Sequence, residues 1–291
     1  MSYIDREIVV NFLLAKGDFG ETGQNSLTIS GLRVECEVNN AGGVLGSNLL
    51  MKIYGMKESD MTKCSTFALS IGTVKDVTVT VMAGDKQSGM SQIFQGTIFF
   101  GMIDYNEMPN VPLVIQARAG YVEQSLPAAP NSTPGPMDVA ERIKALAKGI
   151  DYTFTNNGVN KSLQNHYSWG SPIEQIRDIA RAASIDLDIS NGTVSIWPYG
   201  GAKDNQMVEV SAAKGLVGYP TYIGIGYTIT TTFSADMVRG RRCRLDGGIA
   251  RTKGDFFIQE VRHYLTSQLP NGPWFTIATL TVKETVGVLN Y

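Results

Sequence analysis

The residues most able to do chemistry in this sequence are basic side chains that gather toward its C-terminal end. They are Arg239, Arg241, Arg242, Arg244, Arg251 and Lys253. Arginine forms paired hydrogen bonds with carboxylates and phosphates. The cluster is therefore a solvated face, an interface with acidic groups of a neighbouring subunit, or a contact with nucleic acid.

Groups suited to metal or cofactor binding are few. The two histidines, His166 and His263, lack the spacing typical of metal ligands, and we interpret both as packing residues. The glycine-rich segment 42–46 lacks the Lys-Ser/Thr pair of a phosphate-binding loop. The sequence therefore predicts no metal site and no cofactor.

Two carboxylate pairs, Asp186 with Asp188 and Glu58 with Asp60, have the residue types that hydrolyse glycans. If each pair lies on a strand, both side chains point the same way, close together and into solvent. That is a poor arrangement for a general acid and a nucleophile. We therefore predict that the chain is not an enzyme.

Size and composition are those of an ordinary globular chain. Its 291 residues, 43% of them hydrophobic and with a net charge of −2, suggest two or three domains and argue against a nucleic-acid coat. Three widely spaced cysteines, Cys36, Cys64 and Cys243, predict no disulfide framework and synthesis in a reducing compartment. The N-terminus does not resemble a signal peptide, and no run of about 18 apolar residues is present, so we expect no membrane insertion.

Short segments that alternate apolar and polar residues dominate the first part of the chain and predict strands. They cover residues 6–14, 32–38, 49–54, 77–83, 92–103 and 113–117. Turn residues separate them, so a single sheet or barrel of about six strands fits.

The sequence changes character at residues 125–136, where four prolines predict an extended linker or a surface loop. Two amphipathic helices follow, one over residues 137–148 and one that starts at Ser171 with Pro172 in its first turn. Each helix precedes an alternating strand and an Asn-Gly turn, so the pair has the pattern of an internal duplication. We predict a small α+β module from about residue 136 to residue 201.

Strand-like sequence returns after residue 207 and repeats the order of the first part. The expected fold is mainly β with an α+β insert: two similar small β-barrel domains and a helix-strand module. The expected domains are an N-terminal barrel at 1–122, a proline-rich linker and module at 123–205, and a C-terminal barrel at 206–291. Three such chains would present six similar barrels, which could match a six-fold ring on one side and a three-fold partner on the other.

The chain resembles the phage baseplate hub proteins in a set of segments that occur in the order of that family. They are residues 49–55, 81–84, 93–98, 192–198, 215–220, 238–245, 257–263 and 272–276. The resemblance covers nearly the whole chain, and its weight lies in this collinear order.

The resemblance implies a structural protein of a contractile phage tail: a homotrimer with a central channel that adapts the hexameric tail tube to the trimeric central spike. Its implied partners are its own copies, the tail tube protein, the central spike protein, and the tape measure and baseplate wedge proteins. DNA would pass through the lumen during genome ejection without specific binding. The expected location is the virion tail baseplate, after synthesis and assembly in the host cytoplasm.

Within such an assembly, four of the arginines are the expected contacts with a neighbouring subunit or the tube: Arg239, Arg241, Arg242 and Arg244. Trp169 precedes the second helix and either packs on it as a hydrophobic staple or anchors a subunit contact. Trp197 and Trp274 lie in strand settings and are predicted core residues.

Two other functions fit parts of the sequence. A carbohydrate-binding or weakly lytic tail protein would need a concave aromatic groove and a carboxylate pair. A tail-tube or tail-terminator ring protein would need only one barrel, which the apparent duplication argues against.

Overall fold

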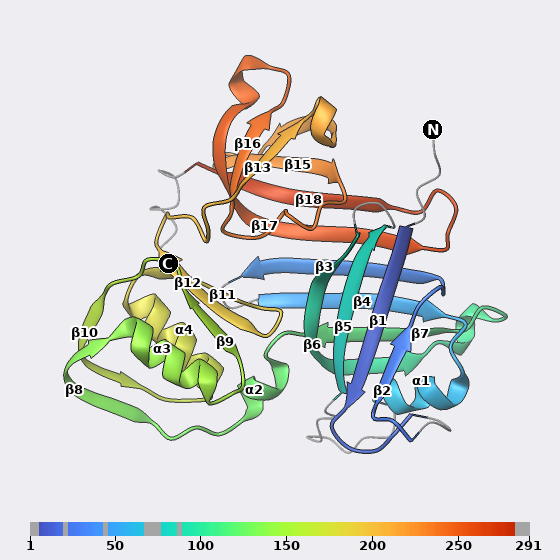
Figure 1. The fold of residues 1–291 in the computed structure, drawn as a ribbon, viewed down its shortest axis with the longest axis horizontal. Coiled ribbons are helices and arrows are strands. Elements are labelled where there is room, and N and C mark those ends of the chain that lie inside the picture. Colours follow the sequence, from blue (N-terminus) through green and yellow to red (C-terminus); the bar gives the residue numbers. More distant parts are fainter. Residues whose placement is uncertain (1–5, 20–22, 43–45, 67–76, 86–88, 283–291) are drawn as a thin grey trace. The chain divides into compact units, whose positions relative to one another are not determined.

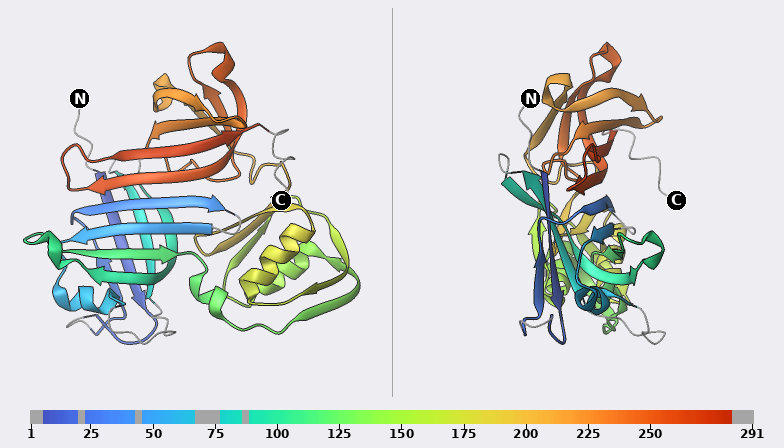
Figure 2. Two further views of the ribbon diagram at one scale, coloured as in Figure 1. Left: turned by 180° about the vertical axis from the view of Figure 1, so that it is seen from behind. Right: turned by 90° about the vertical axis from the view of Figure 1, so that its right-hand side faces the viewer.

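A computed structural model describes residues 6–19, 23–42, 46–66, 77–85 and 89–282 (Figures 1 and 2). The chain divides into two compact units that each gather segments distant in sequence. The first consists of Met1–Asn39, Ser47–Val122 and His263–Trp274, and the second of Asn40–Gly46, Glu123–Arg262 and Phe275–Tyr291. The domain boundaries expected from the sequence stay a prediction.

The first unit is built mainly of antiparallel strands. They are β1 (Arg6–Leu14), β2 (Ser26–Ile29), β3 (Val34–Gly42), β4 (Gly46–Tyr54), β5 (Val77–Asp85), β6 (Gly89–Ile103) and β7 (Pro112–Arg118). Two short helices occur along this part of the chain: α1 (Glu58–Cys64) in this unit, and α2 (Tyr121–Ser125), whose last three residues belong to the second unit. The strand order is β3-β4-β7-β6-β5-β1-β2, so every predicted strand of this part is present and β2 is an addition.

The long strand β6 joins two parts of this sheet that cross one another (Figure 1). Its first half pairs with β5 and its second half with β7, and the register shifts between Ile98 and Phe100 where it passes from one partner to the other. Bulges allow a strand to bend in this way between two packed layers. Side chains that alternate along β1, among them Ile8, Val10 and Phe12, fill the core between the layers.

Gly96 of β6 lies against the backbone at the end of β7, and a larger residue does not fit there. A Cβ at this position would lie 2.6 Å from the carbonyl oxygen of Arg118 and 2.8 Å from the amide nitrogen of Ala119. Because both are backbone atoms, we expect Gly96→Ala to lower the free energy of unfolding by about 1–3 kcal/mol. Urea unfolding measures this, with Gln92→Ala, an exposed position on the same strand, expected to stay within about 0.5 kcal/mol of wild type. Equal effects of the two substitutions would contradict the close approach.

The second unit contains a helix-strand module. Its elements are β8 (Asn131–Asp138), α3 (Val139–Lys148), β9 (Thr153–Asn156), β10 (Ser162–Ser168), α4 (Pro172–Ala182), β11 (Ile185–Ser190) and β12 (Thr193–Pro198). The two helices lie side by side on the sheet of order β11-β12-β9 (Figure 1). Their apolar faces form one core with that sheet, which includes Ile143, Ile176 and Ile196.

Both predicted helices form: α4 starts at its predicted cap, and α3 starts at Val139, two residues after the predicted start. Ser171 and Glu174 make the reciprocal hydrogen bonds of a capping box at the start of α4, and Asp138 accepts a hydrogen bond from the Glu141 amide at the start of α3. The proline-rich segment differs from the expected linker because its second half is the strand β8. Proline favours extended backbone, and a two-stranded ribbon with β10 tolerates the missing N–H groups.

The rest of the second unit is again mostly strands. They are β13 (Met207–Ser211), β14 (Leu216–Tyr222), β15 (Gly226–Thr232), β16 (Arg242–Asp246), β17 (Lys253–Ser267) and β18 (Trp274–Thr281), of which β17 and β18 each have one end in the first unit. Strand β17 pairs with β16 and β18, as β6 does with β5 and β7. The predicted mainly β fold class with a helix-strand module is confirmed. No helix among the described residues is long and apolar enough to cross a membrane.

Candidate functional site

The four arginines expected at an interface lie on β16 and on the loop before it, but they have different surroundings. Arg239 is only 6% exposed. Arg241 donates hydrogen bonds from Nε and Nη2 to Asp204 at 3.0 and 2.9 Å. Arg244 is exposed and forms a bidentate pair with Asp255 at 2.8 and 3.1 Å. The structure therefore spreads them from a buried position to the surface, and their role at an interface stays a prediction.

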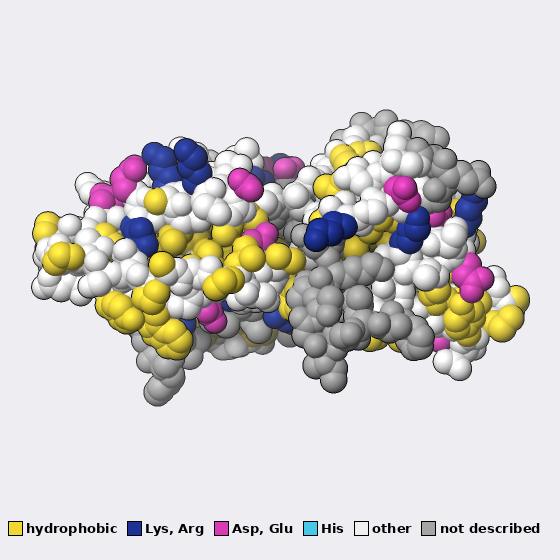
Figure 3. Space-filling model, turned by 90° about the horizontal axis from the view of Figure 1, so that it is seen from below, with side chains coloured by type: hydrophobic (Ala, Val, Ile, Leu, Met, Phe, Trp, Pro, Cys, Tyr) yellow, Lys and Arg dark blue, Asp and Glu magenta, His cyan; other side chains and the backbone are white. Residues whose placement is uncertain are grey.

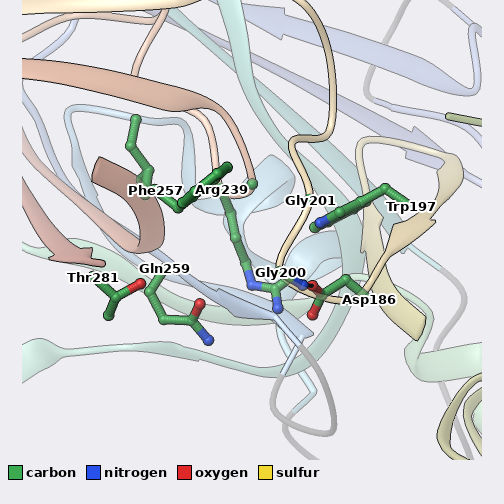
Figure 4. A pocket seen from close by; sticks show the side chains of 10 residues that line it. Asp186, Trp197, Gly200, Gly201, Arg239, Phe257, Gln259 and Thr281 are labelled. Carbon is green, nitrogen blue, oxygen red and sulfur yellow. Dashed lines mark hydrogen bonds between the residues drawn. The ribbon is translucent and has the colours of Figure 1, made fainter. Parts of the chain in front are cut away.

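Arg239 is the centre of a buried polar cluster that we call the Arg239 cluster: Asp186, Asp188, Trp197, Lys203 and Arg239. The guanidinium Nη1 donates a hydrogen bond to the Leu187 carbonyl at 2.9 Å, and the guanidinium carbon lies 5.5 Å from the centre of the Trp197 ring. Figure 4 shows the side chain of Arg239 reaching toward Asp186 and Gly200. Residues that are distant from Arg239 in the sequence thus enclose its side chain.

Asp188 is the most buried charge of the Arg239 cluster, with 1% of its side chain exposed. Its carboxylate accepts hydrogen bonds from Lys203 Nζ at 2.8 Å, Ser190 Oγ at 2.6 Å and Asn40 Nδ2 at 3.3 Å. Burial alone would raise the pKa of Asp188, but the charges of Lys203 and Arg239 and these hydrogen bonds outweigh burial and hold the pKa below its usual value. The carboxylate is therefore ionised and paired.

Asp186 has a different balance. Burial raises its pKa, and the Arg239 charge, the Gly200 amide and a hydrogen bond with Trp197 offset this effect only in part. The cluster thus pairs two carboxylates with two cations, Arg239 and Lys203.

The carboxylate pairs considered for glycan hydrolysis are not placed as expected. Asp186 and Asp188 do lie on one strand, but the prediction that they face solvent is wrong because Asp188 is buried in ion pairs. Glu58 and Asp60 lie on α1 instead of a strand, where residues two apart do not face each other. Glu58 accepts a hydrogen bond from the Tyr105 hydroxyl at 2.7 Å.

The histidines and cysteines are placed as packing residues. Burial lowers the pKa of His263 to about 4, and His166 Nε2 lies 3.5 Å from Asp178 Oδ2. All three cysteines are buried, and no disulfide joins them in the described part of the chain. Within the described ranges, no three His, Cys, Asp or Glu residues come together in a group that could hold a metal ion.

Trp197 and Trp274 are buried, as predicted, whereas Trp169 is 71% exposed and so does not act as a staple on α4. Two tyrosines of β14, which the sequence did not predict as site residues, are similarly exposed: Tyr219 at 76% and Tyr222 at 68%. They lie within residues 215–235, which contain no charged residue. This absence of charge is the sequence signal that could have pointed to them. Figure 3 shows that hydrophobic side chains reach the surface between charged ones in several places.

The family comparison decides what kind of protein carries these features. The family model described as baseplate hub gp41 matches residues 18–278. The chain belongs to this baseplate hub family. Membership of this family makes it a structural component of a phage tail. None of the curated proteins matches the sequence of this baseplate hub protein.

Solved structures with a similar fold also come from tails and related particles. A tail protein from Neisseria meningitidis MC58 has a TM-score of 0.61 at 12% identity, with 94% of this chain and 96% of that chain covered. The 43 kDa tail protein of prophage MuSo2 from Shewanella oneidensis has a TM-score of 0.60 at 8% identity, covering 97% and 98%. The E. coli c3393 protein, a type VI secretion component described as similar to phage T4 tail proteins gp27 and gp5, has a TM-score of 0.53 at 9% identity, covering 96% and 74%. The baseplate hub protein shares the fold of these structures over nearly its whole length.

Proposed function

We propose that this baseplate hub protein is a homotrimer with a central channel that adapts the hexameric tail tube to the trimeric central spike of a contractile tail. DNA passes through the channel during genome ejection without specific binding. The protein is made in the host cytoplasm, acts by shape and symmetry, and has no catalytic role.

The observation that carries this proposal is a repeated strand arrangement within one chain. Strands β5, β6 and β7 form a meander, and so do β16, β17 and β18. In both meanders the middle strand has 15 residues, although the two parts have little sequence in common. A trimer would contain six such meanders, which is the number that a six-fold tube ring needs, while its own three-fold axis suits a trimeric spike.

The proposal predicts the mass of the protein in solution. The chain has a mass of 31.6 kDa, so light scattering should detect a species of about 95 kDa, three times the chain mass. The measurement should cover a range of concentrations and be repeated with the candidate spike protein. A monomer under all these conditions would overturn self-assembly and favour the carbohydrate-binding alternative.

Among the five residues predicted to contact a subunit or the tube, Arg244 and Trp169 have the exposure that such a role needs. Arg244 carries an exposed planar guanidinium, which is paired with Asp255 within the chain and would exchange or share that partner at an interface. Trp169 offers a large apolar side chain of the kind that anchors interfaces. We therefore propose that Arg244 and Trp169, rather than the other three arginines, contact a neighbouring subunit or the tube.

A further inference from the structure

A small cavity lies beside Arg239 within the second unit (Figure 4). Its volume is about 20 Å³, and its polar lining comes from Asp186, Arg239, Gln259 and Thr281. A buried water needs about 10–15 Å³ and two to four polar partners. The cavity therefore has room for a water molecule.

Two of the lining side chains have buried polar atoms without a hydrogen-bond partner among the described residues. They are Arg239 Nε and Thr281 Oγ1. Arg239 is 6% exposed and Thr281 is buried on β18, so bulk solvent does not satisfy either atom. Because buried polar groups are almost always hydrogen-bonded, two such residues lining one cavity indicate a ligand there.

The charges around the cavity decide what that ligand is. Arg239 contributes one positive charge and Asp186 faces it with a carboxylate, while Asp188 is matched by Lys203. An added anion or cation would break this balance in a desolvated site. We propose that the cavity is a binding site for one ordered water molecule, which hydrogen-bonds to Thr281 and completes the Arg239 cluster.

This water would connect β18 to segments that the Arg239 cluster already joins. Arg239 binds the Leu187 carbonyl of β11, and it packs so closely on Gly42 at the end of β3 that a Cβ there would lie 2.0 Å from Arg239 Nε. The next residue, Gly240, accepts a hydrogen bond from the Lys203 amide at 2.7 Å. With the water bound, one network of polar contacts connects the helix-strand module to the C-terminal strands.

The substitution Thr281→Val tests the proposal because the direction of its effect on the thermal midpoint depends on whether the water is present. If Thr281 Oγ1 binds the water, valine removes a hydrogen bond and should lower the thermal midpoint by about 2–4 °C. If the cavity is dry, valine replaces an unsatisfied hydroxyl with an apolar group of the same shape, and the midpoint should stay or rise. An unchanged or raised midpoint would overturn the proposal. The matched control, Thr279→Val at a half-buried position of the same strand, should not shift the midpoint.

A crystal structure of the whole protein gives the direct measurement. A hydrated cavity should show one density peak about 2.5–3.0 Å from Thr281 Oγ1 in the wild type, and no peak in Thr281→Val. A crystal soaked in bromide separates water from an anion, since an anomalous peak in the cavity would mean that an anion binds there. Either that peak or a cavity without density would overturn the proposal.

Discussion

Replacing Asp188 with alanine is expected to lower the free energy of unfolding by about 3–5 kcal/mol. The substitution leaves Lys203 and Arg239 in a buried place with one carboxylate fewer, and it removes the acceptor of the Lys203, Ser190 and Asn40 hydrogen bonds. Loss of one partner from a buried ion pair costs far more than the pair itself contributes, because the remaining charge stays desolvated. Chemical unfolding of the purified protein measures the effect.

The surface pair Arg244–Asp255 provides the matched control. Its geometry is bidentate and its distances are as short as those of the buried pair, but both side chains are about half exposed. Exposed pairs contribute at most about 1 kcal/mol, so Asp255→Ala should change the unfolding free energy by no more than that. If Asp188→Ala and Asp255→Ala changed the free energy of unfolding equally, burial of the Arg239 cluster would not explain the effect of Asp188.

The strands and helices could be predicted because their signals are local. The alternation in residues 6–14 reappears as the buried face of β1, and the capping residues Ser171 and Glu174 meet at the start of α4. The assumption that Glu58 and Asp60 lie on a strand was wrong for a related reason. Seven residues are too few for a helical period to emerge, so α1 could not be separated from a short strand.

The Arg239 cluster could not be predicted because its members are far apart in the sequence. Arg239 and Arg244 are the same residue type five positions apart, yet one is enclosed by Leu187 and Trp197 and the other faces solvent. Nothing near residue 239 distinguishes them, since burial is set by the packing of β11 and β12 about 50 residues earlier. By contrast, the uncharged stretch that holds Tyr219 and Tyr222 is visible in the sequence, and edge strands normally carry charges.

The second large effect concerns acid. Burial lowers the pKa of His263 to about 4, whereas in the unfolded chain it should titrate near 6.5. Between these values the unfolded state binds a proton that the folded state does not, so stability falls as the pH is lowered through this window. We expect the contribution of His263 to the free energy of unfolding to fall by about 3 kcal/mol from pH 6.5 to pH 4. From pH 6.5 to pH 8 this contribution should stay nearly constant.

Denaturant midpoints measured across this range, for the wild type and for His263→Gln, test the expectation. The variant has no imidazole at residue 263, so its profile should lose most of the slope between pH 6.5 and pH 4, whatever its stability at neutral pH. His166→Gln is the control, because it keeps His263 and should keep the slope. The pKa of Asp188 is held low in the folded state, so its contribution to stability is lost only as the pH falls below the unfolded value near 3.8. That loss lies at lower pH than the range in which His263 acts. A slope that survives in His263→Gln would mean that another group binds the proton.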